Sequence, residues 1–279
     1  MPHALLLPFE PRDLAGLPRD CTMALHRQVF EWFRMVDPAL ARSLHDKGHV
    51  PGGAAAEHGG GDGRFPLFTA APADAHGGAD YFVTVLADGD ALFARLCRAI
   101  AAYPALEVDG RAVRLRTEPE VVAVRSYADL HAAAEPVECV RLRFATPTFF
   151  TSGGRTVLPP DPVRVFRGYA ERWNAYAPAE LHLANLADWE QAVRAGVVVR
   201  ASELRPAARA LRKGTRTIRY EGAVGNVTYE ITADDAFACW IDRLSDFAEF
   251  CGTGRMAAQG FGQTYRVDPF EAFPDEDDM

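Results

Sequence analysis

The segment with the most distinctive chemistry is residues 250–267, FCGTGRMAAQGFGQTYRV. It places Gly252, Gly254, Gly260 and Gly262 between an amphipathic stretch and an apolar one. Glycine can adopt a positive φ and lets another chain approach the backbone closely. Successive exposed N–H groups in such a loop can bind phosphate oxygens. The same pattern also fits a glycine-rich helix end followed by a turn, so spacing alone leaves both interpretations open.

A second candidate is the basic run RPAARALRKGTRTIRY, residues 205–220, which contains no acidic residue. Its cations are Arg205, Arg209, Arg212, Lys213, Arg216 and Arg219. Residues 111–220 carry 18 Lys or Arg against 11 Asp or Glu, a charge of +7, although the whole chain has a net charge of −8. Such a run is often only a solvated face, but a ligand bound there would be a polyanion. Nucleic acid therefore remains a candidate partner.

Histidines supply the candidate acid and base groups. His45 and His49 lie on either side of Lys47 in SLHDKGHV, residues 43–50. The ordinary pKa of histidine lies near neutrality, which suits proton transfer, although a histidine at a helix end can simply interact with the last carbonyl groups. The five cysteines are scattered and form no C-x-x-C pair. The sequence therefore predicts no metal site, no disulfide and no cofactor.

The elements that must position these residues are predicted from periodicity. In the first half we expect strands at 4–9, 65–68, 81–86, 112–116 and 121–124, and helices from Thr22 to Asp37, at 39–45 and at 91–103. In the second half we expect strands at 140–144, 197–204, 217–220, 227–231 and 262–267, and helices at 162–176, 186–195 and 233–250. Residues 218–231 have hairpin form, with Gly222 and Gly225-Asn226 at the expected turn.

The order β-α-β-β-α-β thus occurs twice, which predicts an α+β protein with two tandem ferredoxin-like, RRM-like domains. The expected domains are residues 1–130 and 136–270, followed by an acidic tail, EAFPDEDDM, at 271–279. The apolar run at 4–9 is too short for a signal peptide, and no stretch has the length of a membrane span. The sequence therefore indicates a cytoplasmic protein with no membrane partner.

At this point the residues resemble a known family. The two ferredoxin-like halves, the loop GTGRMAAQGFG and the segment TPTFFTSGGRTVLPPDPVRVFRGYAERWNAYAP at 146–178 are similar to CRISPR-associated RAMP endoribonucleases, which process precursor CRISPR RNA. DPALARSLHD, residues 37–46, resembles the family's first-domain helix and the active-site histidine that follows it. The resemblance covers nearly the whole chain.

The resemblance implies metal-independent cleavage of CRISPR repeat RNA by its own 2′-hydroxyl, leaving a 2′,3′-cyclic phosphate. It places His45 at the acid or base, with His49 and Lys47 as assisting candidates. The general acid stays open, because Phe30 and Pro51 stand where some members carry a tyrosine and a lysine. The cations of the basic run, with Arg155, Arg255 and the four glycines of the loop, are then expected to bind the RNA.

Two other classes of function compete. The first is a non-catalytic RNA-binding RAMP subunit that stays on the mature guide RNA within a CRISPR effector complex, together with other subunits. The second is a dinucleotide-binding enzyme, because GTGRMA at 252–257 fits G-x-G-x-x-A. That fingerprint requires a strand before it and a helix after it, and here the expected order is reversed. The sequence therefore favours the ribonuclease.

Overall fold

The computed structural model of the 279-residue chain describes residues 1–15, 17, 21–39, 41, 42, 67–73, 79–86, 90–213 and 216–269, apart from the side chain of Lys213. The glycine-rich segment at 52–63, for which the sequence predicts a loop, and the acidic tail at 271–279 lie outside these ranges.

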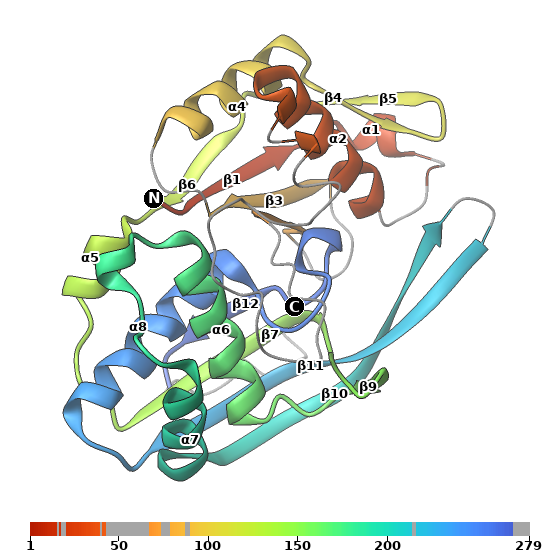
Figure 1. Cartoon of the computed structure of the whole chain (residues 1–279). Coiled ribbons are helices and arrows are strands. Elements are labelled where there is room, and N and C mark those ends of the chain that lie inside the picture. The colour runs from red at the N-terminus through yellow and green to blue at the C-terminus, as the bar shows by residue number, and fades with distance from the viewer. Residues whose placement is uncertain are drawn as a thin grey trace.

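The first half of the chain builds a four-stranded antiparallel sheet with the order β2-β3-β1-β6. Its strands are β1 (His3–Pro8), β2 (Phe68–Pro72), β3 (Asp80–Val85) and β6 (Glu120–Val124). Two helices, α2 (Thr22–Val36) and α4 (Asp90–Ala102), lie on one face of this sheet (Figure 1). This strand order with helices on a single face is the ferredoxin-like arrangement.

Helix α2 forms where the periodicity predicts it. Leu25, Val29, Trp32 and Phe33 recur at helical spacing and are fully buried. The regular helix stops at Val36, and the next residue but one is Pro38. Because a proline disfavours helical backbone in the residue before it, the end of α2 follows from the sequence.

Several smaller elements of the first half were not expected. Strand β4 (Ala105–Val108) forms a hairpin with β5 (Arg111–Arg114), which corresponds to the strand predicted at 112–116, and the unexpected α5 (Tyr127–Ala132) follows β6. The turn of that hairpin is Asp109-Gly110, with both residues at positive φ. Asp-Gly is the usual signal for such a turn, so this hairpin was recognisable from the sequence. The short α1 (Pro11–Leu14) precedes α2.

The second half repeats the architecture in a sheet with the order β10-β11-β7-β12. Its strands are β7 (Cys139–Thr148), β10 (Val197–Lys213), β11 (Arg216–Ile231) and β12 (Thr264–Val267). The helices are α6 (Pro162–Tyr176), α7 (Leu186–Gly196) and α8 (Asp235–Cys251), with a small hairpin of β8 (Phe150–Ser152) and β9 (Arg155–Val157) after β7. Both halves therefore have the βαββαβ order, which confirms the predicted tandem ferredoxin-like fold.

The hairpin of β10 and β11 differs from the prediction. The expected turn at 222–226 was wrong. Strands β10 and β11 pair along their whole length, from Val197 opposite Ile231 to Lys213 opposite Arg216, with one register shift between Val199 and Ala201. Gly225 lies inside β11 with φ 123°, and a side chain there would overlap with the carbonyl group of Glu203. The glycines of this strand thus permit close approach of neighbouring backbone and do not mark its turn. The result is a long two-stranded arm that extends beyond the sheet (Figure 1).

The two halves pack against one another through the helix-free face of the first sheet. The hydroxyl of Thr84 on β3 donates to the carbonyl oxygen of Phe250 on α8 at 2.5 Å. Elsewhere in the interface between the halves, the ring of Tyr127 on α5 lies 5.1 Å from that of Trp173 on α6, measured between centroids. Buried side chains of both halves form one continuous core. The helices within the described ranges are all too short or too polar to serve as transmembrane spans.

Candidate RNA-binding and cleavage site

The glycine-rich loop lies between α8 and β12, and its four glycines all have positive φ. A side chain at Gly262 would overlap with the carbonyl group of Thr253, and one at Gly254 would overlap with that of Phe149. Because only glycine fits both the dihedral angle and the space, the loop can come this close to its neighbours. The prediction of a loop built around glycines at close approach is therefore correct in geometry.

Two side chains of α6 form hydrogen bonds with the start of the glycine-rich loop. The hydroxyl of Tyr169 lies 2.5 Å from that of Thr253, which lies 2.6 Å from that of Thr264, and all three residues are fully buried. Burial raises the pKa of Tyr169 well above its ordinary value, so its hydroxyl remains protonated and can donate. The guanidinium of Arg172 donates to the carbonyl oxygen of Gly254 at 2.5 Å. The start of the loop is thus fixed on the second domain.

Several N–H groups of the loop also form bonds inside the protein. That of Thr253 donates to Gly262 at 2.7 Å, and that of Arg255 donates to Phe149 at 3.0 Å. The N–H of Gly262 donates to Pro147 at 3.2 Å. These amides are therefore engaged in shaping the loop, and the cations around it become the stronger candidates for phosphate contacts.

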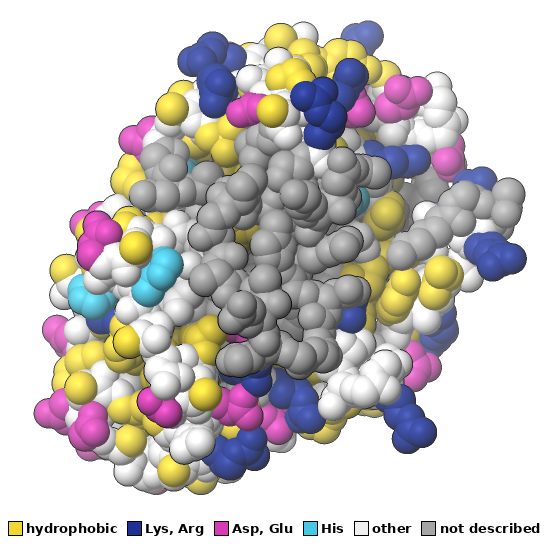
Figure 2. Space-filling model, viewed as in Figure 1, with side chains coloured by type: hydrophobic (Ala, Val, Ile, Leu, Met, Phe, Trp, Pro, Cys, Tyr) yellow, Lys and Arg dark blue, Asp and Glu magenta, His cyan; other side chains and the backbone are white. Residues whose placement is uncertain are grey.

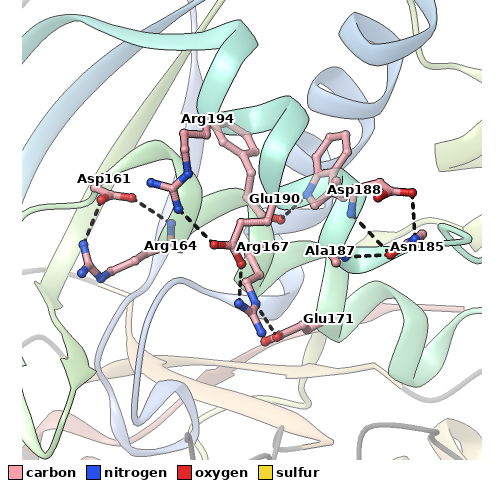
Figure 3. A network of polar contacts seen from close by, with 11 residues as sticks. Asp161, Arg164, Arg167, Glu171, Asn185, Ala187, Asp188, Glu190 and Arg194 are labelled. Atoms are coloured by element: carbon pink, nitrogen blue, oxygen red, sulfur yellow. Dashed lines mark hydrogen bonds and ion pairs between the residues drawn. The ribbon is translucent and has the colours of Figure 1, made fainter. Parts of the chain in front are cut away.

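Helix α6 is itself held by ion pairs with α7 (Figure 3). Arg167 on α6 pairs with both Glu171 of its own helix and Glu190 of α7, and Glu190 also pairs with Arg194 at 3.0 Å. These bonds raise the pKa of Arg167, and the largest cause is its hydrogen bond to Glu171. At the start of α7, the side chain of Asn185 accepts from the N–H of Ala187 at 2.9 Å. The network fixes the helix on which the glycine-rich loop rests.

The basic run forms most of the arm made by β10 and β11, and its side chains divide between two faces. On one face, Leu211 and Tyr220 pack with Phe149 and Phe261 in a small apolar cluster of their own. The ring of Tyr220 lies 5.7 Å from that of Phe261 and 5.9 Å from that of Phe149, measured between centroids. The arm is therefore seated on the glycine-rich loop by aromatic contacts.

The cations of the arm have different environments. Arg205, Arg216 and Arg219 are exposed, and Arg212 is exposed while it pairs with Asp109 of the β4–β5 turn at 3.4 Å. Arg209 is partly buried and turned toward the loop, where its guanidinium donates to the carbonyl oxygen of Gly260. Figure 2 shows dark blue basic side chains among yellow hydrophobic ones along this edge of the molecule. Sequence alone did not separate Arg209 from its neighbours.

Arg155 and Arg255 are brought to one place by the β8–β9 hairpin. Arg155 begins β9 opposite Ser152, and the guanidinium of Arg255 donates to the hydroxyl of Thr151 on β8 at 3.0 Å. Both arginines are exposed. The structure thus places a second pair of cations on the side of the glycine-rich loop near this hairpin.

The candidate acid and base residues His45, Lys47 and His49 lie outside the described residues. The structure does describe His26 on α2, whose Nδ1 lies 2.8 Å from the carbonyl oxygen of Ala258 in the short helix η2 (Ala257–Gln259) of the glycine-rich loop. A carbonyl oxygen only accepts, so Nδ1 must carry the hydrogen. The ring also lies 5.0 Å from that of Phe30 and 5.5 Å from that of Phe68. His26 therefore joins α2 to the loop.

A cavity of about 270 Å³ lies between the two domains. Leu6, Phe82 and Thr84 line it from the first sheet. Glu249 and Tyr265 line it from the second domain, and burial raises the pKa of Glu249 and raises that of Tyr265 to about 12. Within the described ranges, no three His, Cys, Asp or Glu side chains are grouped so that they could hold a metal ion.

Comparison with known proteins agrees with this geometry. Residues 142–264, from β7 to the start of β12, match the family described as CRISPR-associated endoribonuclease Cas6. Proteins of that name from two strains of Mycobacterium tuberculosis are each 33% identical to this chain over 144 residues. That match covers 51% of this chain and 43% of each relative, so it spans less than half of their length.

Solved structures extend the similarity to the whole chain. One described as a Cas6 (TTHB231) product complex has a TM-score of 0.72 at 23% identity, covering 96% of this chain and 100% of the other. A Cas6 (TTHA0078) product complex has a TM-score of 0.71 at 25% identity, covering 96% and 99%. The shared fold consists of two tandem ferredoxin-like domains with a glycine-rich loop after the last helix. In its fold over nearly the whole chain, and in its sequence over residues 142–264, the chain is similar to CRISPR-associated Cas6 proteins.

Proposed function

We propose that this chain is an endoribonuclease that binds CRISPR repeat RNA and cuts it to produce mature guide RNA. The observation that carries the proposal is the seating of the basic arm on the glycine-rich loop through Tyr220, Phe149 and Phe261. Both parts lie within residues 142–264, the part of the chain that matches the Cas6 family. A polyanion bound by the arm would therefore lie beside the loop and beside the end of α2 that contacts it.

The exposed cations are the proposed phosphate contacts. On the arm these are Arg205, Arg212, Arg216 and Arg219, and near the β8–β9 hairpin they are Arg155 and Arg255. Lys213, whose side chain lies outside the described part of the structure, is proposed as a further contact from its place in the basic run. Contacts to phosphates fix the register of an RNA stem and make affinity depend on salt, while they carry little sequence information. Arg212 would have to exchange its exposed pairing with Asp109 for a phosphate, which is a small cost at a solvated site.

The proposed chemistry needs one base and one acid. A base removes the proton of the 2′-hydroxyl, the 2′-oxygen attacks the adjacent phosphorus, and the bond from phosphorus to the 5′-oxygen breaks. An acid then protonates the 5′-oxygen, leaving a 2′,3′-cyclic phosphate and a 5′-hydroxyl. We assign one of these roles to His45, with Lys47 and His49 as assisting groups, because an imidazole can perform the proton transfer without a metal ion.

The fold supports this assignment through the direction of α2. The start of α2 contacts the glycine-rich loop through His26 and Ala258. From there the helix runs to Val36, and the chain leads on toward residues 43–50. The helix therefore connects the RNA-binding loop to the segment that holds the proposed acid and base.

The test is incubation of the protein with its host repeat RNA in EDTA, with and without a 2′-deoxy substitution at the cut site. We expect cleavage in EDTA and none of the deoxy substrate. A strict need for a divalent ion, or cleavage of the deoxy substrate, would contradict the mechanism. Tight binding of both RNAs without cleavage would instead support the non-catalytic RAMP subunit that stays with the guide RNA and other effector subunits.

A further inference from the structure

Arg209 differs from the other cations of the basic run because its guanidinium forms bonds with two other parts of the protein. One nitrogen, Nη1, donates to the carbonyl oxygen of Gly260 in the glycine-rich loop. The other, Nη2, donates to the hydroxyl of Thr22 on α2 at 2.6 Å. Its Cζ lies 5.8 Å from the ring centroid of Phe261. A single side chain thus joins the arm, the loop and the first domain.

Both partners are shaped for this contact. Gly260 has φ 87°, and a side chain there would overlap with the guanidinium of Arg209 and lie 2.8 Å from the methyl group of Thr22. Thr22 is the first residue of α2 and is fully buried. A planar guanidinium offers several donors in a fixed geometry, so it can bond to both acceptors at once, whereas the ammonium group of a lysine would keep the charge and only part of this bonding.

A second contact lies one helical turn further along α2. His26 bonds to Ala258 at 2.8 Å, so the loop holds the start of α2 at residues 22 and 26. A helix of this length extends for about 20 Å, and a tilt of about 3° at one end moves the other end by about 1 Å. A displacement of that size at a reacting group can cost about a hundredfold in rate.

We propose that Arg209 is a positioning residue for RNA cleavage, which fixes the direction of α2 relative to the glycine-rich loop and the RNA-binding arm. This inference rests on the proposed function. It assigns Arg209 an effect on the cleavage step, whereas the exposed arginines of the same arm act on RNA affinity.

The test compares five single variants, and the double variant Arg209→Met/Thr22→Val, with the wild type. Arg209→Met removes both bonds, Arg209→Lys keeps the charge, and Thr22→Val removes the acceptor on α2 with little change of shape. Arg219→Met removes an exposed cation on the same arm. Arg200→Met, on the exposed first part of β10, is the control for loss of one charge. For each protein we would measure the single-turnover cleavage rate at saturating protein, the dependence of RNA affinity on salt, and the midpoint of thermal unfolding.

We expect Arg209→Met to lower the saturating rate by about ten- to a hundredfold while the slope of log affinity against log salt stays at the wild-type value. Arg209→Lys should recover part of the rate, and Thr22→Val should lower it in the same direction. The double variant Arg209→Met/Thr22→Val should be no slower than Arg209→Met, because the bond that Thr22→Val removes is already absent in Arg209→Met. Arg219→Met should reduce the salt slope by about one unit. Arg200→Met should match the wild type.

Several results would overturn the inference. A slope reduced by about one unit in Arg209→Met with an unchanged saturating rate would make Arg209 a phosphate contact. A lower rate that Arg209→Lys does not recover and Thr22→Val does not share would reduce its role to general stability. If Arg209→Met fails to fold, a wild-type rate in Thr22→Val is enough to reject the inference. Failure of the wild type to cut RNA would instead reject the proposed function, and the inference with it.

Discussion

The Nδ1 atom of His26 on α2 lies 2.8 Å from the carbonyl oxygen of Ala258 in the glycine-rich loop, so a residue of the first domain bonds directly to the loop that closes the second. Nδ1 donates whether the ring is neutral or charged, because a carbonyl oxygen can only accept. The link between the domains is therefore expected to persist across the neutral pH range.

Replacing His26 with phenylalanine keeps an aromatic ring against Phe30 and Phe68 but removes the donor. We expect the free energy of unfolding to fall by about 1–2 kcal/mol, the usual loss for an unpaired partner of a partly buried hydrogen bond. Urea denaturation at neutral pH measures it, and a variant as stable as the wild type would contradict the assigned hydrogen bond.

Tyr169→Phe tests the hydrogen bond that joins α6 to the start of the glycine-rich loop. The change removes the hydroxyl that bonds to Thr253 at 2.5 Å and leaves a fully buried threonine with one partner fewer. We expect a loss of about 1–2 kcal/mol in the free energy of unfolding. Tyr103→Phe, at a more exposed position, is the matched control and should change stability by less than about 0.5 kcal/mol. If the two changes lowered the free energy of unfolding equally, the hydrogen bond between Tyr169 and Thr253 would make no measurable contribution to stability.

Glu249 gives a prediction about pH. Although Glu249 is exposed at the rim of the cavity between the domains, local desolvation raises the pKa of its carboxyl group, and this outweighs the hydrogen bond that Oε1 accepts from the N–H of Arg266 at 3.2 Å. A folded-state pKa above the unfolded value means that the fold favours the protonated form. The corresponding stability is complete at low pH and is lost as pH rises through the folded pKa.

Glu249→Gln, which keeps an acceptor for Arg266, is therefore expected to be more stable than wild type at neutral pH. The advantage should disappear below about pH 4, where the wild-type carboxyl is protonated in both states. Urea denaturation of both proteins at the two pH values is the measurement. A variant that is less stable than wild type at neutral pH would show that the ionised carboxylate is stabilised in the fold.

The cations of the arm should determine how RNA affinity depends on salt. Replacing Arg212, Lys213 and Arg216 together with alanine is expected to weaken binding of repeat RNA and to flatten the plot of log affinity against log salt by about one unit per lost contact. Arg194→Ala, which removes an exposed cation from α7, is the control and should leave the slope unchanged. An unchanged slope in the triple variant would place the RNA elsewhere on the protein.

Much of the fold could be predicted because local patterns and tertiary packing agree. Helix α2 was found from Leu25, Val29 and Phe33, which are buried as expected, and the tandem βαββαβ order follows from the succession of elements. The hairpin turn was misplaced because Gly222 and Gly225 look like turn residues in a single sequence. Their actual neighbours, Thr148 and Glu203, are brought close only by the assembled sheet.

The candidate site could be predicted in its residue types but not in its division of roles. Arg209 and Arg212 belong to the same basic run, yet one bonds to Gly260 and Thr22 while the other lies exposed against Asp109. Which face of a strand meets the loop depends on contacts between residues about 50 to 190 positions apart. The periodicity of two along β10 was a usable signal, since Arg209 and Leu211 share a face, but it could not show what that face meets.

The most direct test of the proposed function is single-turnover cleavage of repeat RNA by the His45→Ala variant. We expect the rate at saturating protein to fall by about two to four powers of ten, the usual contribution of a general acid or base, while affinity for the RNA stays close to that of wild type. A variant that cuts at the wild-type rate would contradict the assignment of His45 and move the search to His49 or His26.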